Sequence, residues 1–228
     1  MKKKEPSAQT IFVIDFDGTI SVNDSTTMLA EKYIPDMHRG YLRDIRAGKI
    51  SVRKYIKDQL EALSITKEEY ISTLRNEMKI DHSFKNFLTK NWDFVIVSAG
   101  TLQNVYYSLK EKDIYISPKK IISNQLNFNG EKMTVETSRR YFDQENGVNK
   151  AKVIEDFQKQ NYHVIFIGDS ISDFEGAKAA DIVYAKKNQK LTTYLQEQGI
   201  AFFEYQNFDE IISHFHRRQG GIALTNTR

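Results

Sequence analysis

The sequence predicts an α/β protein with a doubly wound, mostly parallel sheet. Short runs rich in β-branched and aromatic residues recur at wide spacing, and stretches with helical periodicity separate them. The runs 94–97 (Phe-Val-Ile-Val) and 164–167 (Val-Ile-Phe-Ile) are apolar at every position, which is typical of strands buried on both faces of a parallel sheet. Parallel strands need long crossover connections, and the helical stretches supply them.

Strands are expected at six places in the chain. They are 10–15, 93–98, 120–124, 163–168, 181–185 and 201–205. The interval between Ser21 and Ser98 is far longer than one crossover requires. Helical periodicity divides it into helices at 24–34, 37–47, 52–63 and 67–78. Thr66, with Glu69 three residues later, has the spacing of a capping box and marks the start of the last of these helices.

A hairpin and two tails complete the expected organisation. Asn127-Phe-Asn129-Gly130 lies between two alternating segments within 125–142, which predicts a small β-hairpin. We therefore expect a core domain formed by 8–20 and 80–217, with a helical cap at 21–79 inserted after the first strand. We expect flexible tails at 1–7 and 218–228.

The composition describes a folded globular protein and excludes several kinds of site. The chain has 228 residues, of which 40% are hydrophobic and 28% charged, with only 3 prolines. The 33 Lys and Arg residues nearly balance the 30 Asp and Glu residues, so the net charge of +3 makes no electrostatic case for a nucleic-acid partner. The absence of cysteine excludes a disulfide framework, a thiolate metal site and a cysteine nucleophile.

The sequence also gives no sign of membrane insertion or secretion. No apolar run approaches the roughly 20 residues that cross a bilayer as a helix. The basic start of the chain, Met1-Lys-Lys-Lys, is not followed by the apolar segment of a signal peptide. We expect a cytoplasmic protein without a membrane partner.

Acidic residues follow two of the expected strands at their carboxyl ends, where open α/β sheets bind their ligands. Asp15 and Asp17 follow the first strand, and Asp169 and Asp173 follow the strand at 163–168. Carboxylates crowded at one site repel each other unless a cation or a proton lies between them, and Mg²⁺ takes oxygen ligands of this kind. Each pair alone has a structural alternative, since Asp-Gly is a turn signal and acidic residues cap helices.

Two further segments add groups that can bind an anion. Ser98-Ala99-Gly100 follows the strand at 93–98 and combines a hydroxyl with small residues at an expected helix N-terminus. Lys150 opens another expected helix, and Lys152 competes with it for the same role. The structural alternatives are a serine N-cap and solvated lysines.

In chain order, the motifs Asp-x-Asp, Ser, Lys and Gly-Asp-x3-Asp resemble those of the haloacid dehalogenase (HAD) superfamily of phosphotransferases. The resemblance extends from about Ile11 to Phe215, and independent motifs agree in chemistry, order and strand context. It implies a HAD-type Rossmann-like parallel core with a helical cap after the first strand.

The resemblance also implies a role for each motif residue. Asp15 would be the nucleophile that becomes an aspartyl phosphate, and Asp17 the general acid and then the general base. The implied phosphate-binding residues are Ser98, Ala99, Gly100 and Lys150. The implied Mg²⁺ ligands are Asp15, the main-chain carbonyl of Asp17, and Asp169, with Asp173 in support.

The acid at Asp17 favours one reaction class. The ion pumps of the superfamily carry Thr at this place and its dehalogenases lack the acid, whereas a carboxyl group here can activate water. We therefore expect a Mg²⁺-dependent phosphatase, a phosphoric monoester hydrolase, acting on a small phosphorylated metabolite.

The helical insert resembles the cap of the phosphoserine-phosphatase-like branch. Within that branch, the segments 15–24, 168–173 and 205–211 are most similar to phosphatases of 2-hydroxy-3-keto-5-methylthiopentenyl-1-phosphate in methionine salvage, although the cysteine cluster common in that group is absent. A phosphoserine phosphatase is the alternative; such enzymes carry Glu where Asp24 stands and use a cap arginine, for which Arg53 is the candidate. Asp24 is either a substrate contact or the N-cap of the helix that follows.

A signalling module is the alternative from another functional class. Receiver-type signalling modules also gather acids, a hydroxyl and a lysine around Mg²⁺, but they pair adjacent acids after the first strand and lack a cap of this size. Tyr33, Tyr41 and Tyr55 are expected in the core or between helices. No histidine is assigned a role, and the sequence leaves a homodimer open.

Overall fold

The computed structural model describes residues 9–225. Its main sheet has seven strands in the order β4 (Lys132–Glu136), β3 (Ile121–Asn129), β2 (Phe94–Thr101), β1 (Gln9–Ile14), β7 (Tyr162–Gly168), β8 (Ile182–Lys186) and β9 (Phe203–Tyr205). Every pair is parallel except β3 with β4. The six expected strands are all present, and the predicted α/β class is confirmed.

The central strand β1 places the carboxyl ends of three strands side by side. Ile14, its last residue, pairs with Ile96 of β2 on one side and Ile167 of β7 on the other. The segments that follow β1, β2 and β7 therefore start at one edge of the sheet, where a parallel sheet gathers its ligand-binding residues.

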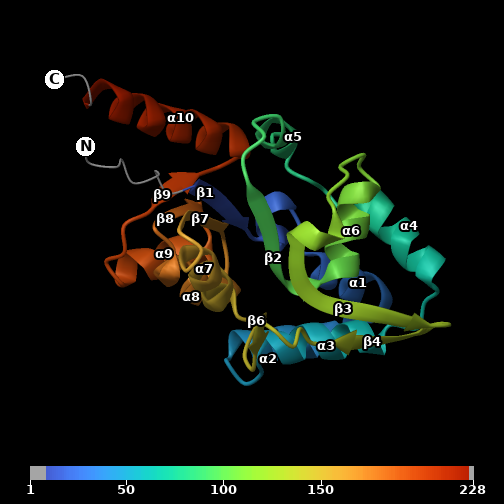
Figure 1. The fold of residues 1–228 in the computed structure, drawn as a ribbon. Helices are drawn as coiled ribbons and strands as arrows, with labels where there is room; N and C mark the ends of the chain where they lie inside the picture. The colour runs from blue at the N-terminus through green and yellow to red at the C-terminus, as the bar shows by residue number, and fades with distance from the viewer. Residues whose placement is uncertain (1–8, 226–228) are drawn as a thin grey trace.

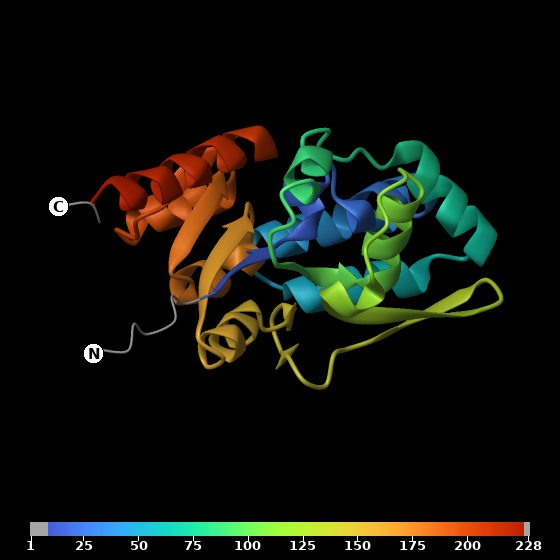
Figure 2. The ribbon, with the colours of Figure 1, turned by 45° about the horizontal axis from the view of Figure 1, so that its top comes forward.

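Helices cover both faces of the sheet, as Figures 1 and 2 show. Phe12 and Ile14 pack into a core with residues of α5 (Phe84–Leu88), α6 (Leu102–Lys110) and α10 (Phe208–Thr225). Ile11 and Val13 point to the other face, where α7 (Lys150–Gln158), α8 (Phe174–Ala179) and α9 (Lys190–Glu197) lie. This alternation explains why β1 is apolar at consecutive positions.

Between β1 and β2 the chain forms the four expected helices. They are α1 (Ser25–Tyr33), α2 (Pro35–Arg46), α3 (Val52–Ala62) and α4 (Lys67–Glu77). Thr66 caps α4 by accepting a hydrogen bond from the backbone N–H of Glu69 at 3.2 Å, as the spacing predicted. The two chain segments that lead into and out of this helical insert run antiparallel, with Ser21 bridged to Ile80 and the N–H of Val22 donating to Lys79.

The predicted hairpin is formed by β3 and β4. Its tight turn contains Gly130, whose φ of +62° is a left-handed conformation that glycine adopts without a steric penalty. The hairpin reaches the helical insert, because Glu61 at the end of α3 accepts a hydrogen bond from the N–H of Val135 at 2.8 Å. A second, smaller hairpin joins β5 (Phe142–Asp143) to β6 (Gly147–Val148).

The expectation of a flexible tail at 218–228 needs a correction. Helix α10 continues to Thr225, so 218–225 is helical. Gly220 and Gly221 each cost about 1 kcal/mol relative to alanine in a helix, which weakens a helix without ending it. The expected tail at 1–7 and residues 226–228 lie outside the described residues.

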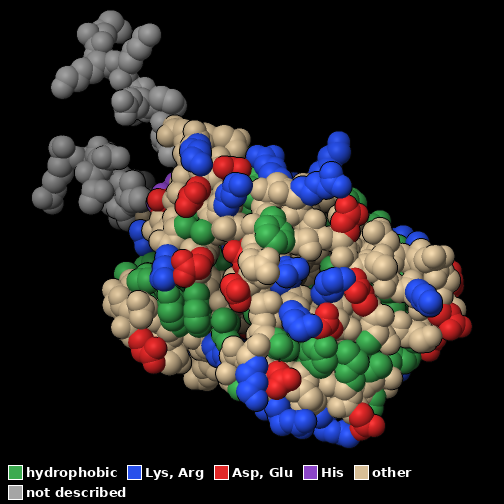
Figure 3. All heavy atoms as spheres, turned by 90° about the horizontal axis from the view of Figure 1, so that it is seen from below, with side chains coloured by type: hydrophobic (Ala, Val, Ile, Leu, Met, Phe, Trp, Pro, Cys, Tyr) green, Lys and Arg blue, Asp and Glu red, His purple; other side chains and the backbone are tan. Residues whose placement is uncertain are grey.

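Two further features bear on the expected partners. None of the helices within 9–225 combines the length and the apolar character that crossing a bilayer requires. On the face shown in Figure 3, basic and acidic side chains are interspersed, in keeping with the near balance of charge in the sequence.

Candidate active site

Asp15 begins the site at the end of β1. Its backbone N–H donates to the carbonyl of Ile167 at 2.9 Å, which fixes the residue between the ends of β1 and β7, and only 3% of its surface is exposed. The chain then turns sharply through Phe16–Ile20 with Gly18 at a φ of +83°. A Cβ on Gly18 would lie 2.4 Å from Oδ2 of Asp169, so this close approach needs glycine as well.

Lys150 reaches Asp15 from the first residue of α7. Its side chain is 1% exposed, and its Nζ donates to Oδ1 of Asp15 and to Oδ1 of Asp173, both at 2.5 Å. Burial lowers the pKa of Lys150, but the two carboxylates outweigh burial and raise it overall. Lys152 is exposed and contacts none of these acids, so the structure brings only the first of the two candidate lysines to the acidic residues.

Asp169 and Asp173 follow β7. Asp173 accepts hydrogen bonds at Oδ2 from the backbone N–H groups of Asp169 at 2.9 Å and Ser170 at 2.8 Å, and thereby holds the turn after the strand. Asp169 accepts a hydrogen bond from the hydroxyl of Thr19 at 3.0 Å. One carboxylate oxygen each from Asp15, Asp169 and Asp173 lies within 4.8 Å of the other two.

Burial and crowding disfavour the charged forms of Asp15 and Asp169. Burial and the Asp173 carboxylate raise the pKa of Asp15 to about 7, against the opposing effect of Lys150. Burial and Asp15 raise the pKa of Asp169 well above its ordinary value. Three buried hard-oxygen donors with excess negative charge fit a divalent cation, and this donor set is the one that Mg²⁺ prefers.

Ser98 lies on β2, and α6 begins later than the sequence suggested. The N-cap of α6 is Thr101, whose hydroxyl accepts a hydrogen bond from the N–H of Asn104 at 3.3 Å. Ser98 instead accepts a hydrogen bond from the N–H of Gly100 at 3.0 Å. The expectation that Ser98 lies at the N-terminus of a helix is therefore wrong, because the strand continues for three residues after Ser98.

Asp17 and Asp24 lie near each other, on the side of the site where the helical insert begins. Oδ1 of Asp17 accepts a hydrogen bond from the backbone N–H of Ser25 at 2.7 Å. Asp24 is the N-cap of α1, since its Oδ1 accepts from the N–H of Thr27 at 2.7 Å. Desolvation and the nearby Asp24 raise the pKa of Asp17 well above its ordinary value.

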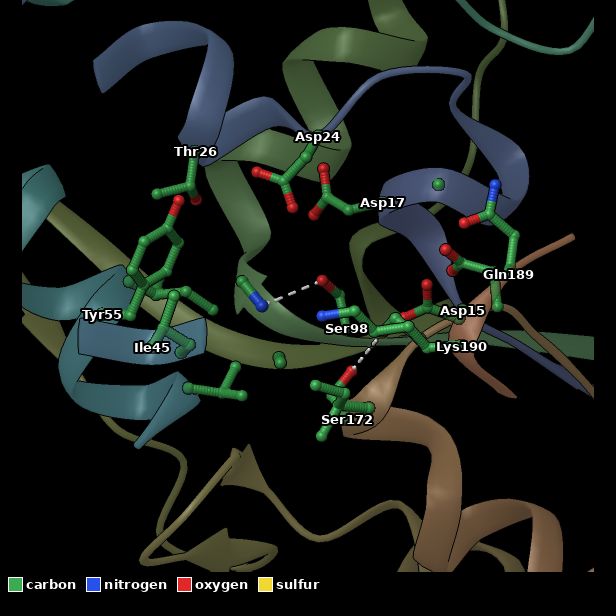
Figure 4. Close-up of a pocket in the computed structure, with 18 of the residues that line it drawn as sticks. Asp15, Asp17, Asp24, Thr26, Ile45, Tyr55, Ser98, Ser172, Gln189 and Lys190 are labelled. Carbon is green, nitrogen blue, oxygen red and sulfur yellow. Dashed lines mark hydrogen bonds between the residues drawn. The ribbon is translucent and has the colours of Figure 1, made fainter. Parts of the chain in front are cut away.

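One pocket of about 350 Å³ lies between the sheet edge and the helical insert, and it is lined by Asp15, Asp17, Asp24, Ser98 and Asp169. Figure 4 shows Asp15 and Ser98 on one side, Asp17 and Asp24 above them, and Ile45, Tyr55 and Thr26 opposite. The wall that the insert contributes is mostly apolar. Besides Asp24 and Thr26, it comprises Leu42, Ile45, Val52, Tyr55 and Ile56, with Arg46 as its basic member.

Several pocket residues were not predicted. Gln189 and Lys190 reach the pocket from the segment after β8, beside Asp15 in Figure 4. In the sequence, their position just after the carboxyl end of β8 was the signal that could have indicated a place in the pocket. Tyr55 is buried, as expected, but it also lines the pocket.

Arg53 is not the pocket arginine that the resemblance suggested. Its Nε donates to the carbonyl of Gln144 at 3.0 Å, and its guanidinium lies over the ring of Phe142. Arg53 is the second residue of α3 and contacts the small hairpin, while Arg46 at the end of α2 lines the pocket.

Comparisons with known proteins agree with this fold. The sequence model of one family, described as pyrimidine 5'-nucleotidase (UMPH-1), matches residues 23–209. The chain is 28% identical to 2-hydroxy-3-keto-5-methylthiopentenyl-1-phosphate phosphatase of Exiguobacterium sibiricum, over 88% of this chain and 93% of the relative. It is 27% identical to Pdp3-interacting factor 1 of Schizosaccharomyces pombe, over 86% of this chain and 90% of the relative.

Solved structures show the same fold. A substrate-bound phosphoserine phosphatase superimposes with a TM-score of 0.69 and 17% identity, over 93% of this chain and 99% of that chain. A phospho-aspartyl intermediate analogue of phosphoserine phosphatase gives a TM-score of 0.68 and 18% identity, over 91% and 99% of the two chains. The predicted HAD-type phosphatase is thereby confirmed as the class of this protein. Within that class, the chain belongs to the pyrimidine 5'-nucleotidase (UMPH-1) family.

Proposed function

We propose that this phosphatase hydrolyses a small phosphomonoester with Mg²⁺ through an aspartyl phosphate on Asp15. One observation carries the proposal: the Asp15 carboxylate lies in the pocket while Lys150 holds one of its oxygens and Asp169 lies close by. A carboxylate approaches a phosphate dianion only where positive charge offsets both; Lys150 supplies one positive charge, and Mg²⁺ held by the acidic residues would supply the rest.

In the first step, an oxygen of Asp15 forms a bond to phosphorus while the bond from phosphorus to the leaving oxygen breaks. Asp17 gives its proton to that leaving oxygen. In the second step, Asp17 takes a proton from a water molecule, the water oxygen bonds to phosphorus, and the bond from phosphorus to Asp15 breaks. Both carboxyl groups return to their starting forms, so the enzyme turns over.

The other motif residues bind the phosphoryl group and the cation. Ser98, Ala99, Gly100 and Lys150 surround the phosphoryl oxygens in our proposal. The ligands of Mg²⁺ would be Asp15, the main-chain carbonyl of Asp17, and Asp169, with Asp173 fixing the turn that carries Asp169. Bound Mg²⁺ supplies the positive charge that offsets the phosphoryl oxygens and the crowded carboxylates.

Residues 21–79 act as a cap in this proposal and bind the leaving group. The motif residues bind the phosphoryl group, which every phosphomonoester has. Selectivity between substrates therefore requires side chains from the insert, such as Ile45 and Tyr55. Asp24 keeps its role as N-cap and also faces the pocket, where its second oxygen is placed to contact a polar group of the substrate.

The preferred substrate is 2-hydroxy-3-keto-5-methylthiopentenyl-1-phosphate, which would place the enzyme in methionine salvage. The name of the Exiguobacterium relative and the apolar wall of the insert support this choice, because a methylthio group suits an apolar surface. A cavity of about 350 Å³ is at the small end of ligand pockets, which favours a small metabolite over a nucleic acid.

A pyrimidine nucleoside monophosphate is the second candidate, because the family match includes most of the chain. Phosphoserine is a third, and it would place its carboxylate against Arg46 rather than Arg53. A phosphoacceptor signalling module would form the same aspartyl phosphate without rapid turnover.

A panel of phosphorylated metabolites, assayed with Mg²⁺ and with a chelator, tests this proposal. The panel includes the methylthiopentenyl compound, pyrimidine nucleoside monophosphates and phosphoserine, with Asp15→Asn as the inactive control. We expect multiple turnovers only with Mg²⁺ and the highest kcat/KM for the methylthiopentenyl compound. A single turnover with every member would support the signalling module, and activity that survives chelation would contradict the proposed cofactor.

A further inference from the structure

A buried side-chain amide on α6 connects the helical insert to the general acid of the site. Asn104 is fully buried, and all four of its hydrogen-bonding positions are occupied. Its Oδ1 accepts hydrogen bonds from the hydroxyls of Tyr70 at 2.5 Å and Thr101 at 2.6 Å. Its Nδ2 donates to the hydroxyls of Ser25 at 2.7 Å and Thr26 at 3.5 Å. A saturated buried amide holds its neighbours in one arrangement, because any displacement leaves a polar group unpaired.

Two of these partners form the first turn of α1. The same Ser25 whose hydroxyl binds Asn104 uses its backbone N–H to donate to Oδ1 of Asp17. Asn104 is therefore connected to Asp17 through one intervening residue, even though the two are far apart in the sequence. Ser25 and Asn104 are both fully buried, so no exchange with bulk water competes with the connection.

The N–H of Ser25 fixes the orientation of the Asp17 carboxyl group. Oδ1 accepts this hydrogen bond, which leaves Oδ2 as the oxygen that can face the substrate. Oδ2 faces the phosphate-binding segment, since a Cβ placed on Gly100 would lie 3.4 Å from it and 3.2 Å from the hydroxyl of Ser98. Oδ2 is therefore the Asp17 oxygen nearest to the place where the leaving oxygen would lie in the proposed function.

We propose that Asn104 is a positioning residue that holds the first turn of α1 so that Asp17 presents Oδ2 to the leaving oxygen. This inference rests on the proposed function, in which Asp17 is the general acid. Tyr70 extends it to the insert, because α4 contributes its hydroxyl to the same amide and α4 packs against α6. Figure 1 shows α1, α4 and α6 side by side.

The test compares an alkyl phosphate with p-nitrophenyl phosphate, whose leaving oxygen needs little protonation. Asn104→Ala and Ser25→Ala should each lower kcat on the alkyl phosphate by about tenfold or more, since acid catalysis contributes about 10²–10⁴ in rate and misplacement loses part of it. The loss on p-nitrophenyl phosphate in the first, bond-breaking step should be less than about threefold, with KM nearly unchanged on both. Ser25→Ala keeps the backbone N–H and removes only the hydroxyl that Asn104 holds.

Two controls separate positioning from general loss of structure. Ser108→Ala removes another buried polar group from α6, one with no hydrogen-bond partner among the described residues, and should leave both rates unchanged. The double variant Ser25→Ala/Asn104→Ala should be no slower than the slower single variant, because both act through one connection. Tyr70→Phe should show the same dependence on the leaving group with a smaller loss of kcat. If Asn104→Ala does not fold, Tyr70→Phe and Ser25→Ala together test the inference.

Equal losses on the two substrates, or additive effects in the double variant, would overturn the inference. Asp17→Asn distinguishes this result from a failure of the proposed function. If Asp17→Asn shows the leaving-group dependence and the Ser25 and Asn104 variants do not, the role of the network is wrong and that of Asp17 stands. If Asp15→Asn still turns over either substrate, the proposed function and the inference both fail.

Discussion

Lys150 donates a hydrogen bond to Asp15 across 135 positions of sequence, from a side chain that is only 1% exposed. The same ammonium group binds Asp173, so one buried cation lies between two buried carboxylates. Breaking such an arrangement by removing one partner costs about 3–5 kcal/mol of stability, because the remaining charges are left uncompensated. Lys150 therefore stabilises the fold and, in the proposed function, also binds the phosphoryl group.

Replacing Lys150 should damage both activity and stability. We expect Lys150→Met to lower kcat by about 10² or more, since it removes a positive charge from the transferring phosphoryl group, and to lower the melting temperature. Lys152→Met is the matched control on the same helix, because Lys152 is exposed and does not contact the acidic residues, so it should affect neither quantity. Equal effects of the two variants in rate and thermal denaturation measurements would contradict the assignment of Lys150.

Gly18 provides a sharp test of the acidic cluster. In Gly18→Ala, the added methyl group would clash with Oδ2 of Asp169, so the concentration of Mg²⁺ that gives half-maximal activity should rise at least about tenfold. Gly199→Ala controls for backbone strain, because Gly199 has a φ of +64° but no atom within 4 Å of the place that a Cβ would take. Both variants should lose some stability, and only Gly18→Ala should change the Mg²⁺ dependence. An unchanged Mg²⁺ titration in Gly18→Ala would place the cation elsewhere.

Binding of Mg²⁺ should stabilise the fold. A ligand that binds only the folded state at 100 times its dissociation constant adds about 2.7 kcal/mol, which raises the melting temperature of a protein of this size by several degrees. Asp169→Asn should reduce this increase, because it removes a proposed ligand charge. Differential scanning fluorimetry with and without Mg²⁺ measures both effects. An equal increase in the variant and the parent protein would exclude Asp169 as a ligand.

Changes on the pocket wall of the insert should alter selectivity and leave the chemistry intact. Ile45→Asn puts a polar amide on the apolar wall, so kcat/KM should fall for substrates with apolar leaving groups and fall less for polar ones. Asp44→Ala, next to it on α2 and outside the pocket lining, should leave the ranking of substrates unchanged. The Mg²⁺ requirement should persist in both. A uniform loss over the whole panel for Ile45→Asn would contradict the role of the insert in selectivity.

Much of the fold and of the acidic site could be predicted from local sequence. Continuous apolar runs indicated the buried strands, and acidic residues directly after them indicated Asp15 and Asp169, because parallel strands bring their carboxyl ends together. The choice of Lys150 over Lys152 came only from family resemblance. Helix starts do not reveal which lysine points inward, and the structure settles that by the direction of the first turn of α7.

Other site features could not be predicted because they depend on packing between distant elements. Asn104 looks like any helix N-terminal asparagine in the sequence, and only the meeting of α1, α4 and α6 gives it four partners. Arg46 and Arg53 are equivalent candidates until the orientation of α2 and α3 is known. The persistence of β2 through Thr101 likewise follows from its pairing with Asn124 of β3, which no local signal specifies.

The division of labour between Asp15 and Asp17 is the central claim, and intact-mass measurement of the acid-quenched enzyme tests it most directly. With p-nitrophenyl phosphate, Asp17→Asn should form the aspartyl phosphate but hydrolyse it slowly, since the water-activating base is missing and such steps contribute about 10²–10⁴ in rate. We predict one added phosphate that hydroxylamine removes in Asp17→Asn, little in the parent enzyme and none in Asp15→Asn. Phosphate on Ser98, or undiminished turnover by Asp15→Asn, would contradict the mechanism.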